Sequence, residues 1–455
     1  MNTDASHLGS TSNTYANEAL LAFTGGVPWD KQLVAQEMRV QQAWLDVLAQ
    51  TGDISQSEHM QIAEALESVQ TEMRGGTFAW SMSDEDIHMN IERAVVAKVG
   101  PIGKKMHLGR SRNDLIATTL ALYIADVCDD QVGKIAAMVI ALVDQAEAVS
   151  DVIIPAMTHL QHGQPIALSQ VLLGHAAGFA RDVEQFQHVR RIALAAMPLG
   201  AAACNGTTVE ADFDSIASKL GFAGPCFNSY DAVGSRDALL VLHDAIGLSA
   251  MHVGRLAQDV IFWSSTPVAL ARLAPDWSTG SSIMPNKRNP DVAEISRAKV
   301  ARLQSAGSAA KQICSQIGSS YFSDLHELKK LTLDAIELWN ETLGVFVPFI
   351  ASLEFQREAA DKLLDEGHIL ATDLANDLVA GGMSFRDAYK QVASEVAEAQ
   401  ANGSQIGAGS SSLTPQNSVA RRNAAGGTGP VGLASQIAVL KEKVREWGQA
   451  NEAPN

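Results

Sequence analysis

Three clusters of polar and charged residues each stand directly before a long apolar stretch. The first, GSSIMPNKRNP at 280–290, is typical of a loop because it begins with Gly-Ser-Ser and contains two prolines. A serine nucleophile normally needs a base beside it, and this loop contains neither histidine nor an acid. Any partner of its serines must therefore come from elsewhere.

The second cluster is HLGRSRNDLI, in which Ser111, Asn113 and Asp114 precede an apolar run. Each of the three could cap the following helix, and capping is the stronger interpretation of this motif alone. Arg110 and Arg112, however, crowd a helix N-terminus, where the helix dipole is already positive. Arginine beside free backbone N–H groups commonly binds carboxylate or phosphate, so the cluster also indicates an anion site.

The third cluster, MTHLQHGQP, contains His159 and His162. Two histidines three residues apart can bind metal, but no acidic or cysteine ligand lies near them in the sequence, so we predict no metal site. A histidine acting as general acid or base needs an orienting partner. Glu294, just after the 280–290 loop, is the candidate if the fold brings the two together.

Composition narrows the class of protein. A hydrophobic fraction of 46%, a charged fraction of 19% and a mean hydropathy of +0.02 are typical of a globular chain. The net charge of −17 opposes nucleic acid binding. The longest apolar run, at 135–143, is too short to cross a membrane, and no export signal is visible. The four cysteines lack CxxC spacing, which favours a reducing cytoplasm over zinc or disulfides.

Proline positions outline the elements, because proline inside a helix costs roughly 3 kcal/mol. Long proline-free stretches rich in helix-favouring residues fill most of the chain. The stretch 114–149 is so apolar that most of its sides must be covered, as in the middle of a bundle. We predict an all-α fold with three helical domains, at 1–107, 108–348 and 349–455, in which about the first twenty residues form a loose arm.

Taken together, these motifs resemble the argininosuccinate lyase family of the fumarase/aspartase superfamily. GSSIMPNKRNPD is similar to the superfamily signature, and the more specific family pattern is matched in order along almost the whole chain by EDIHMNIE, GRSRND, THLQHGQP, NSYDAV, ATDLAND and NSVARRNAAGG. The resemblance implies a homotetramer with one large helical bundle and active sites built from three subunits. It also implies a cofactor-free reaction in which an N-substituted aspartate, a small dicarboxylate, loses a proton and then its amine, leaving fumarate.

The resemblance implies residue roles as well. Ser281 is similar to the catalytic base, and Lys287 and Asn289 would hold the carboxylate on which charge accumulates. His159, oriented by Glu294, is similar to the residue that protonates the leaving nitrogen, with His162 and His326 as alternatives. The other residues implied to bind substrate are Ser111, Arg112, Asn113, Thr158, Gln164, Ser282, Tyr321, His326 and Lys329.

The chain departs from the family where the amine would bind. Gly26 stands where the family has a serine, Ser323 replaces a lysine, His326 replaces a glutamine, and Phe213 takes an arginine position. Such changes normally alter specificity and not reaction type. The hypotheses are therefore a lyase acting on argininosuccinate, a sister lyase acting on another N-substituted aspartate, such as an aminopolycarboxylate or a biosynthetic succinyl adduct, and, as a remote third, a non-catalytic structural relative.

Overall fold

The computed structural model describes residues 18–407 and 410–452. Most of the predicted N-terminal arm lies outside this part of the chain, which begins with helix α1 (Glu18–Thr24). Within it, no helix combines the length and the apolarity that a membrane crossing requires.

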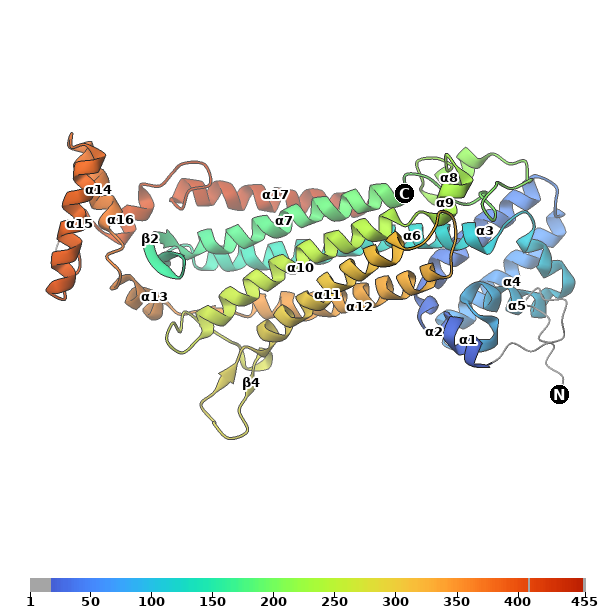
Figure 1. Cartoon of the computed structure of the whole chain (residues 1–455), viewed down its shortest axis with the longest axis horizontal. Coiled ribbons are helices and arrows are strands. Elements are labelled where there is room, and N and C mark those ends of the chain that lie inside the picture. Colours follow the sequence, from blue (N-terminus) through green and yellow to red (C-terminus); the bar gives the residue numbers. More distant parts are fainter. Residues whose placement is uncertain (1–17, 408–409, 453–455) are drawn as a thin grey trace.

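Long helices packed side by side form the body of the molecule (Figure 1). They are α6 (Arg112–Ala148), α7 (Leu168–Ala193), α10 (Asp237–Ser264), α11 (Asp291–Ser315) and α12 (Asp324–Ala351). The apolar stretch at 114–149 lies in the single helix α6, whose buried side chains, among them Ile135 and Leu142, belong to the common core. Helix α17 (Pro430–Glu452) packs along α6 and α7.

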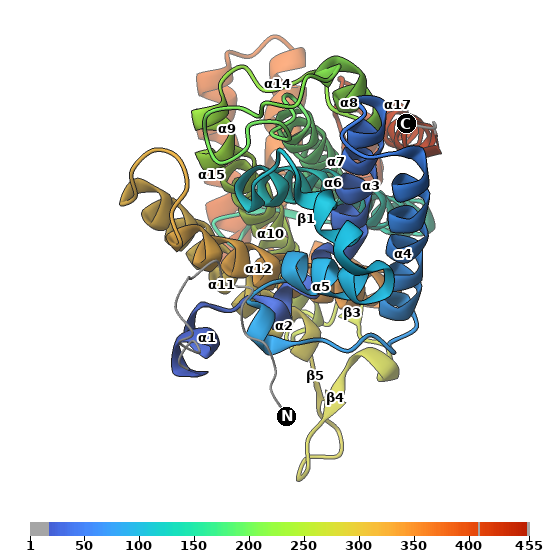
Figure 2. The ribbon, with the colours of Figure 1, turned by 90° about the vertical axis from the view of Figure 1, so that its right-hand side faces the viewer.

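Shorter helices cover the end of the bundle where α6 begins (Figure 2). Their core includes Trp44, whose indole Nε1 donates to the Leu108 carbonyl 2.9 Å away, and it extends onto α6 through Leu115 and Leu122. These elements are α2 (Val27–Asp30), η2 (Lys31–Leu33), α3 (Val34–Gln50), α4 (Gln56–Arg74), η3 (Met82–Asp84), α5 (Ile87–Val99), η4 (Gly100–His107), α8 (Phe213–Leu220) and α9 (Ser229–Gly234).

The opposite end of the bundle carries α13 (Arg357–Leu364), α14 (Ala371–Ala380), α15 (Phe385–Ala401) and α16 (Pro415–Ala420) (Figure 1). Helices α14 and α15 share a small core of Ala375, Val392 and Ile406. Helix α12 continues through Pro348, and α17 returns to the bundle. The division into three domains, at 1–107, 108–348 and 349–455, stays a prediction.

The predicted all-α class is confirmed, and strands in the described residues are short. Strands β1 (Ile153–Thr158) and β2 (Gln161–Ala167) form an antiparallel hairpin, so MTHLQHGQP is a hairpin and not a simple loop before a helix. Strands β4 (Thr279–Gly280) and β5 (Arg288–Asn289) form the stem of the 280–290 loop. Strand β3 (Ala271–Arg272) pairs with β6 (Glu354–Phe355), and η5 (Pro275–Trp277) follows β3.

Candidate active site

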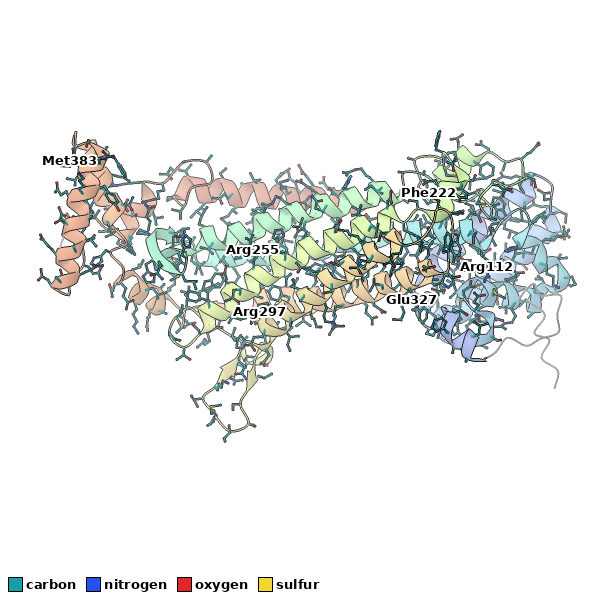
Figure 3. All side chains as sticks on the ribbon, viewed as in Figure 1. Arg112, Phe222, Arg255, Arg297, Glu327 and Met383 are labelled. Atoms are coloured by element: carbon teal, nitrogen blue, oxygen red, sulfur yellow. The ribbon has the colours of Figure 1, made fainter. Side chains whose placement is uncertain are left out.

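The predicted site residues separate into two groups at opposite ends of the bundle. Helix α6 has 37 residues, which at 1.5 Å per residue makes it about 55 Å long. Arg112 lies at the end where α6 begins, whereas the β1–β2 and β4–β5 hairpins stand toward its other end (Figure 3). Within one chain the three motifs therefore do not converge.

We name the two groups by their positions. The α6-start group is Ser111, Arg112, Asn113, Tyr321, His326 and Lys329. The hairpin group is Thr158, His159, Gln164, Ser281, Ser282, Lys287, Asn289 and Glu294.

Ser111 is the N-cap of α6, as its motif alone predicted. It forms a capping box with Asp114, whose carboxylate accepts from the Ser111 backbone N–H at 3.0 Å. The other carboxylate oxygen of Asp114 accepts from the backbone N–H groups of Gly200 and Ala202, at 3.1 and 2.9 Å. The Asn113 amide donates to the Ala203 carbonyl, so the start of α6 is fixed to the 200–203 loop.

The two arginines that crowd this helix start are balanced by acceptors. Arg112 lies 3.1 Å from Glu85 and from Asp86, and these carboxylates raise its pKa although burial lowers it. Arg110 is buried and donates to Gln41 at 2.9 Å. Arg112 is thus the half-exposed cation that a substrate carboxylate could reach, and Arg110 is committed to the interior.

Tyr321 and His326 lie where the loop before α12 meets the start of that helix, and the charge of Arg112 reaches Tyr321. The Tyr321 hydroxyl is 2.7 Å from Nε2 of His326. Burial raises the pKa of Tyr321 to about 12, against the lowering effect of Arg236 and Arg112. Burial and Lys329 lower the pKa of His326. This pair therefore offers a neutral hydroxyl and a neutral imidazole at neutral pH.

Lys329 forms a buried ion pair with Asp30, at 2.6 Å. Both side chains are buried, at 3% and 0% exposure. A Cβ atom on Gly26 would lie only 2.8 Å from the Asp30 carboxylate, so the serine typical of the family does not fit here without a shift. Burial and Lys329 lower the pKa of His326, against a hydrogen bond with the Thr24 backbone, which raises it. His326 therefore lies beside the segment that carries Gly26.

Phe213, the fourth departure, does not belong to this cluster. Its ring packs against Gly200, where an added Cβ would lie 2.3 Å from the ring. The Phe213 side chain, which is apolar, therefore supports the 200–203 loop, which holds the start of α6.

A buried network of charged side chains lies behind the α6-start group and was not predicted from the sequence. Glu37 and His88 are 2.8 Å apart and both fully enclosed, and Thr119 donates to the same Glu37 carboxylate at 2.8 Å. Burial opposes protonation of His88, but Glu37 and Asp86 raise its pKa above the ordinary value. The signal that could have revealed it is the position of His88 inside EDIHMNIE, two residues after Asp86, the partner of Arg112.

We expect this network to make stability depend on pH. Below the ordinary imidazole pKa of about 6.5, His88 is protonated in both folded and unfolded chains, so its ion pair contributes fully. As pH rises above that value the unfolded chain releases its proton first, and the free energy of unfolding falls. Urea unfolding of the parent and of His88→Gln between pH 6 and 9 measures this; equal pH slopes in the two proteins would exclude a protonated His88.

The turn of the β1–β2 hairpin holds His159 in a strained conformation. His159 and Leu160 both have positive φ, at 55° and 57°, in a two-residue turn between Thr158 and Gln161. Asn-Gly is the usual sequence for such a turn, because most other residues are sterically strained at positive φ. Strain of this kind is concentrated at functional sites, and all three residues from Thr158 to Leu160 are exposed.

The next residues of this hairpin contact the C-terminal part of the chain. The Gln164 side-chain oxygen lies 3.4 Å from the guanidinium of Arg422, which also pairs with Asp373 at 3.0 Å. Nδ1 of His162 lies 3.4 Å from the Glu366 carbonyl. Gln164 and His162 thus have partners within the chain, and His159 makes no side-chain hydrogen bond with the described residues.

Ser281 stands at the start of the loop between β4 and β5, which projects away from the bundle (Figure 2). Its Oγ accepts from the backbone N–H groups of Ile283 and Met284, at 3.3 and 3.1 Å. Two N–H donors stabilise negative charge on an oxygen. Ser282 and Lys287 are exposed on the same loop.

The base of this loop is fixed to α11. Asp291 accepts from the backbone N–H and the hydroxyl of Thr279, at 3.1 and 2.5 Å. The Asn289 amide lies 3.5 Å from the same hydroxyl. Glu294, exposed in the first turn of α11, makes no side-chain contact with His159 among the described residues, so the expected His159–Glu294 pair does not form within one chain.

A cavity of about 360 Å³ separates the His159 turn from the end of α10. His159 and Leu160 line it together with Asp259, Phe262 and Trp263 of α10. Within 18–407 and 410–452, no group of three or more histidine, cysteine or acidic side chains is placed to hold a metal ion.

Comparison with known proteins agrees with this architecture. A family model described as lyase matches residues 12–305, and one described as argininosuccinate lyase C-terminal matches residues 368–418. The argininosuccinate lyase of Dechloromonas aromatica (strain RCB) is 34% identical over 93% of this chain and 95% of that protein. That of Dehalococcoides mccartyi (strain CBDB1) is 34% identical over 98% of this chain and 100% of its own.

Solved structures share the fold at lower identity. EDDS lyase has a TM-score of 0.79 at 21% identity, covering 96% of this chain and 94% of that one. The class II fumarase of Schistosoma mansoni has a TM-score of 0.72 at 18% identity, covering 96% of each chain. A bundle of this kind, with polar motifs at both ends, defines a helical carbon–nitrogen lyase of the fumarase/aspartase superfamily. Within that superfamily, the chain belongs to the argininosuccinate lyase family.

Proposed function

We propose that this enzyme cleaves argininosuccinate to arginine and fumarate by β-elimination. The observation that supports it best is Ser281, whose Oγ accepts two backbone N–H groups on a loop that also carries Lys287. A serine hydroxyl is a very weak acid, so it can act as a base only where donors stabilise its alkoxide and water is excluded. The loop supplies the donors, and closure over substrate would exclude the water.

In this mechanism Ser281 takes the proton from the carbon beside one carboxylate, and the resulting negative charge spreads onto that carboxylate. Lys287, Asn289 and Ser282 hold it there. The electrons held on that carboxylate then form the C=C bond of fumarate as the C–N bond breaks. The electron pair of the C–N bond stays on nitrogen, and His159, oriented by Glu294 of another copy, protonates that nitrogen.

The remaining predicted residues bind the substrate. Arg112, with Ser111 and Asn113, binds a substrate carboxylate at the α6-start end of the bundle. Thr158 and Gln164 bind a substrate carboxylate at the hairpin end. Tyr321 and His326 face the leaving amine, and Lys329 acts there through its buried ion pair with Asp30.

We further propose that the protein works as a homotetramer in the cytoplasm, with each site completed by residues of several copies. The separation of the α6-start group from the hairpin group supports this, because α6 alone spans about 55 Å. The four cysteines are free, in keeping with a reducing compartment.

Mixing two inactive variants tests the shared site. Arg112→Ala damages the α6-start group and Ser281→Ala damages the hairpin group. If each site takes these groups from different copies, random mixed tetramers should recover about one quarter of the parent activity, because one site in four combines two intact groups. Dissociation, mixing and reassembly, followed by an assay of fumarate release, measures this. Arg112→Ala mixed with itself is the control, and no recovery in the mixture would place each site within one copy.

The departures at the amine side favour one alternative, a lyase for another N-substituted aspartate, such as an aminopolycarboxylate or a biosynthetic succinyl adduct. The Asp30 carboxylate is held by Lys329 against Gly26, so it is already neutralised before a basic amine could bind it. A site whose Asp30 carboxylate is already paired with Lys329 would suit a less basic amine.

Ultraviolet absorbance of fumarate decides between these activities. The purified protein is incubated with argininosuccinate, and, in the reverse direction, with fumarate and a panel of amines. Rapid fumarate release from argininosuccinate supports the first function. Reaction only with another amine supports the alternative, and silence with every amine would favour a structural role.

A further inference from the structure

The C-terminal part of the chain holds the β1–β2 hairpin along strand β2. Helix α16 lies against β2, and the segment that follows α16 continues along the strand (Figure 1). The Thr428 hydroxyl accepts from the backbone N–H of Ala167 at 2.8 Å, and the Gly426 carbonyl accepts from the Gln170 side chain at 2.8 Å. Most of this segment is NSVARRNAAGG, a motif to which the proposed mechanism gives no role.

Arg422 is the residue of this motif that contacts a predicted substrate-binding side chain. Its guanidinium is anchored to the last turn of α16, where it donates to the Ser418 carbonyl and, at 2.6 Å, to the Ser418 hydroxyl. The buried Asp373 carboxylate lies 3.0 Å from it and also accepts from the Ser418 hydroxyl at 2.7 Å. Nη2 of Arg422 donates to Oε1 of Gln164 at 3.4 Å. The guanidinium therefore reaches Gln164 from a fixed position.

This contact decides which way the Gln164 amide faces. A guanidinium has donors and no acceptor, so only the oxygen of the amide can face it. The oxygen and nitrogen ends of an amide are nearly equal in size, and a half-turn of the group exchanges them. Arg422 selects one of these two orientations and leaves Nε2 of Gln164, which has no hydrogen-bond partner among the described residues, directed elsewhere. A free amide N–H group is a donor that a carboxylate can accept.

We propose that Arg422 is a positioning residue for a substrate carboxylate, because it holds the Gln164 amide with Nε2 available to that carboxylate. This inference rests on the proposed function, in which Gln164 binds a substrate carboxylate at the hairpin end. Without Arg422, the amide can present its oxygen instead, which repels a carboxylate. The C-terminal motifs thereby set the affinity for substrate without touching it.

A double-mutant cycle tests this role. Gln164→Ala and Arg422→Met should each raise the KM for argininosuccinate roughly 10- to 100-fold, the range for a hydrogen bond to a charged group, and should change kcat less. Adding Arg422→Met to Gln164→Ala should cause no further rise, because the amide that Arg422 orients is already absent. Arg422→Lys should keep most of the parent affinity, since an ammonium also only donates.

Two further measurements separate orientation of Gln164 from support of the fold. Arg422→Met leaves the Asp373 carboxylate buried without its cation, so the cycle is repeated with Asp373→Asn, which removes that charge. Arg421→Met is the matched control and should leave the KM unchanged, because Arg421 pairs with Asp377 on the surface. An equal rise in KM for Arg421→Met and Arg422→Met would overturn the inference, as would a further rise when Arg422→Met is added to Gln164→Ala.

Binding of fumarate distinguishes this inference from the proposed function. Fumarate carries carboxylates but no amine, so the rise in Tm that it causes measures carboxylate binding alone. If argininosuccinate is not cleaved, but Gln164→Ala and Arg422→Met lose the same part of that rise, alone and together, the proposed function fails and the positioning role stands. If argininosuccinate is cleaved and Arg422→Met keeps the full rise, the positioning role fails and the proposed function stands.

Discussion

Replacing Ser281 by alanine should lower kcat by about 10²- to 10⁴-fold, because a positioned general base contributes that much. The KM should change less, since the hydroxyl acts mainly in the transition state. The fold should be unaffected, because Ser281 lies at the start of the loop between β4 and β5. Among the described residues, its hydroxyl bonds only to the backbone of Ile283 and Met284 in that loop. Steady-state fumarate release, with circular dichroism and light scattering as checks of integrity, measures the effect.

Asn286→Ala is the control for this experiment, because it alters the same loop at an exposed residue with no assigned role. It should retain most of the parent activity. Full activity in Ser281→Ala would refute the base assignment, and equal loss in both variants would indicate general disturbance of the loop.

Lys329→Met should lower the free energy of unfolding by about 3–5 kcal/mol, because it leaves Asp30 as an uncompensated buried charge. The pair is enclosed, with side chains 3% and 0% exposed. Urea unfolding at pH 7 measures the loss. Adding Asp30→Asn to the same chain should restore much of the stability, because the buried charge is removed.

The neighbouring Lys330→Met is the matched control. Lys330 pairs with Asp334 on the helix surface, where such a pair contributes about 0–1 kcal/mol. Similar losses in Lys329→Met and Lys330→Met would show that the Asp30 pair does not stabilise the fold, and would leave Lys329 as a residue that serves substrate alone.

The helical elements were predictable because their signals are local. The proline-free apolar stretch at 114–149 predicted the position and the burial of α6. A cap at its start was also predicted, with Ser111 as one of three candidates, and Ser111 is the N-cap. The turn at His159 was not predictable, since His-Leu is not a usual sequence for a turn with two positive φ angles.

Candidate site residues could be chosen from the sequence by their type, but their geometry could not be predicted. The donors to Ser281 are backbone groups, which sequence letters do not specify, and the Lys329–Asp30 pair joins residues from distant parts of the chain. The expected contact between His159 and Glu294 is absent within one chain. Nothing in the spacing of two motifs tells whether they meet within a copy or between copies.

The length of α6 also bears on how this family can diversify. Gly26, Ser323 and His326, where the chain departs from its relatives, all lie toward the α6-start end, whereas Ser281 and Lys287 lie on the β4–β5 hairpin toward the other end of the bundle (Figure 1). On the proposed function, proton abstraction and amine choice therefore depend on opposite ends of one polypeptide. Substitutions at the α6-start end would then change the amine without disturbing the chemistry of the 280–290 loop, and chimaeras joined within the bundle would exchange the two ends.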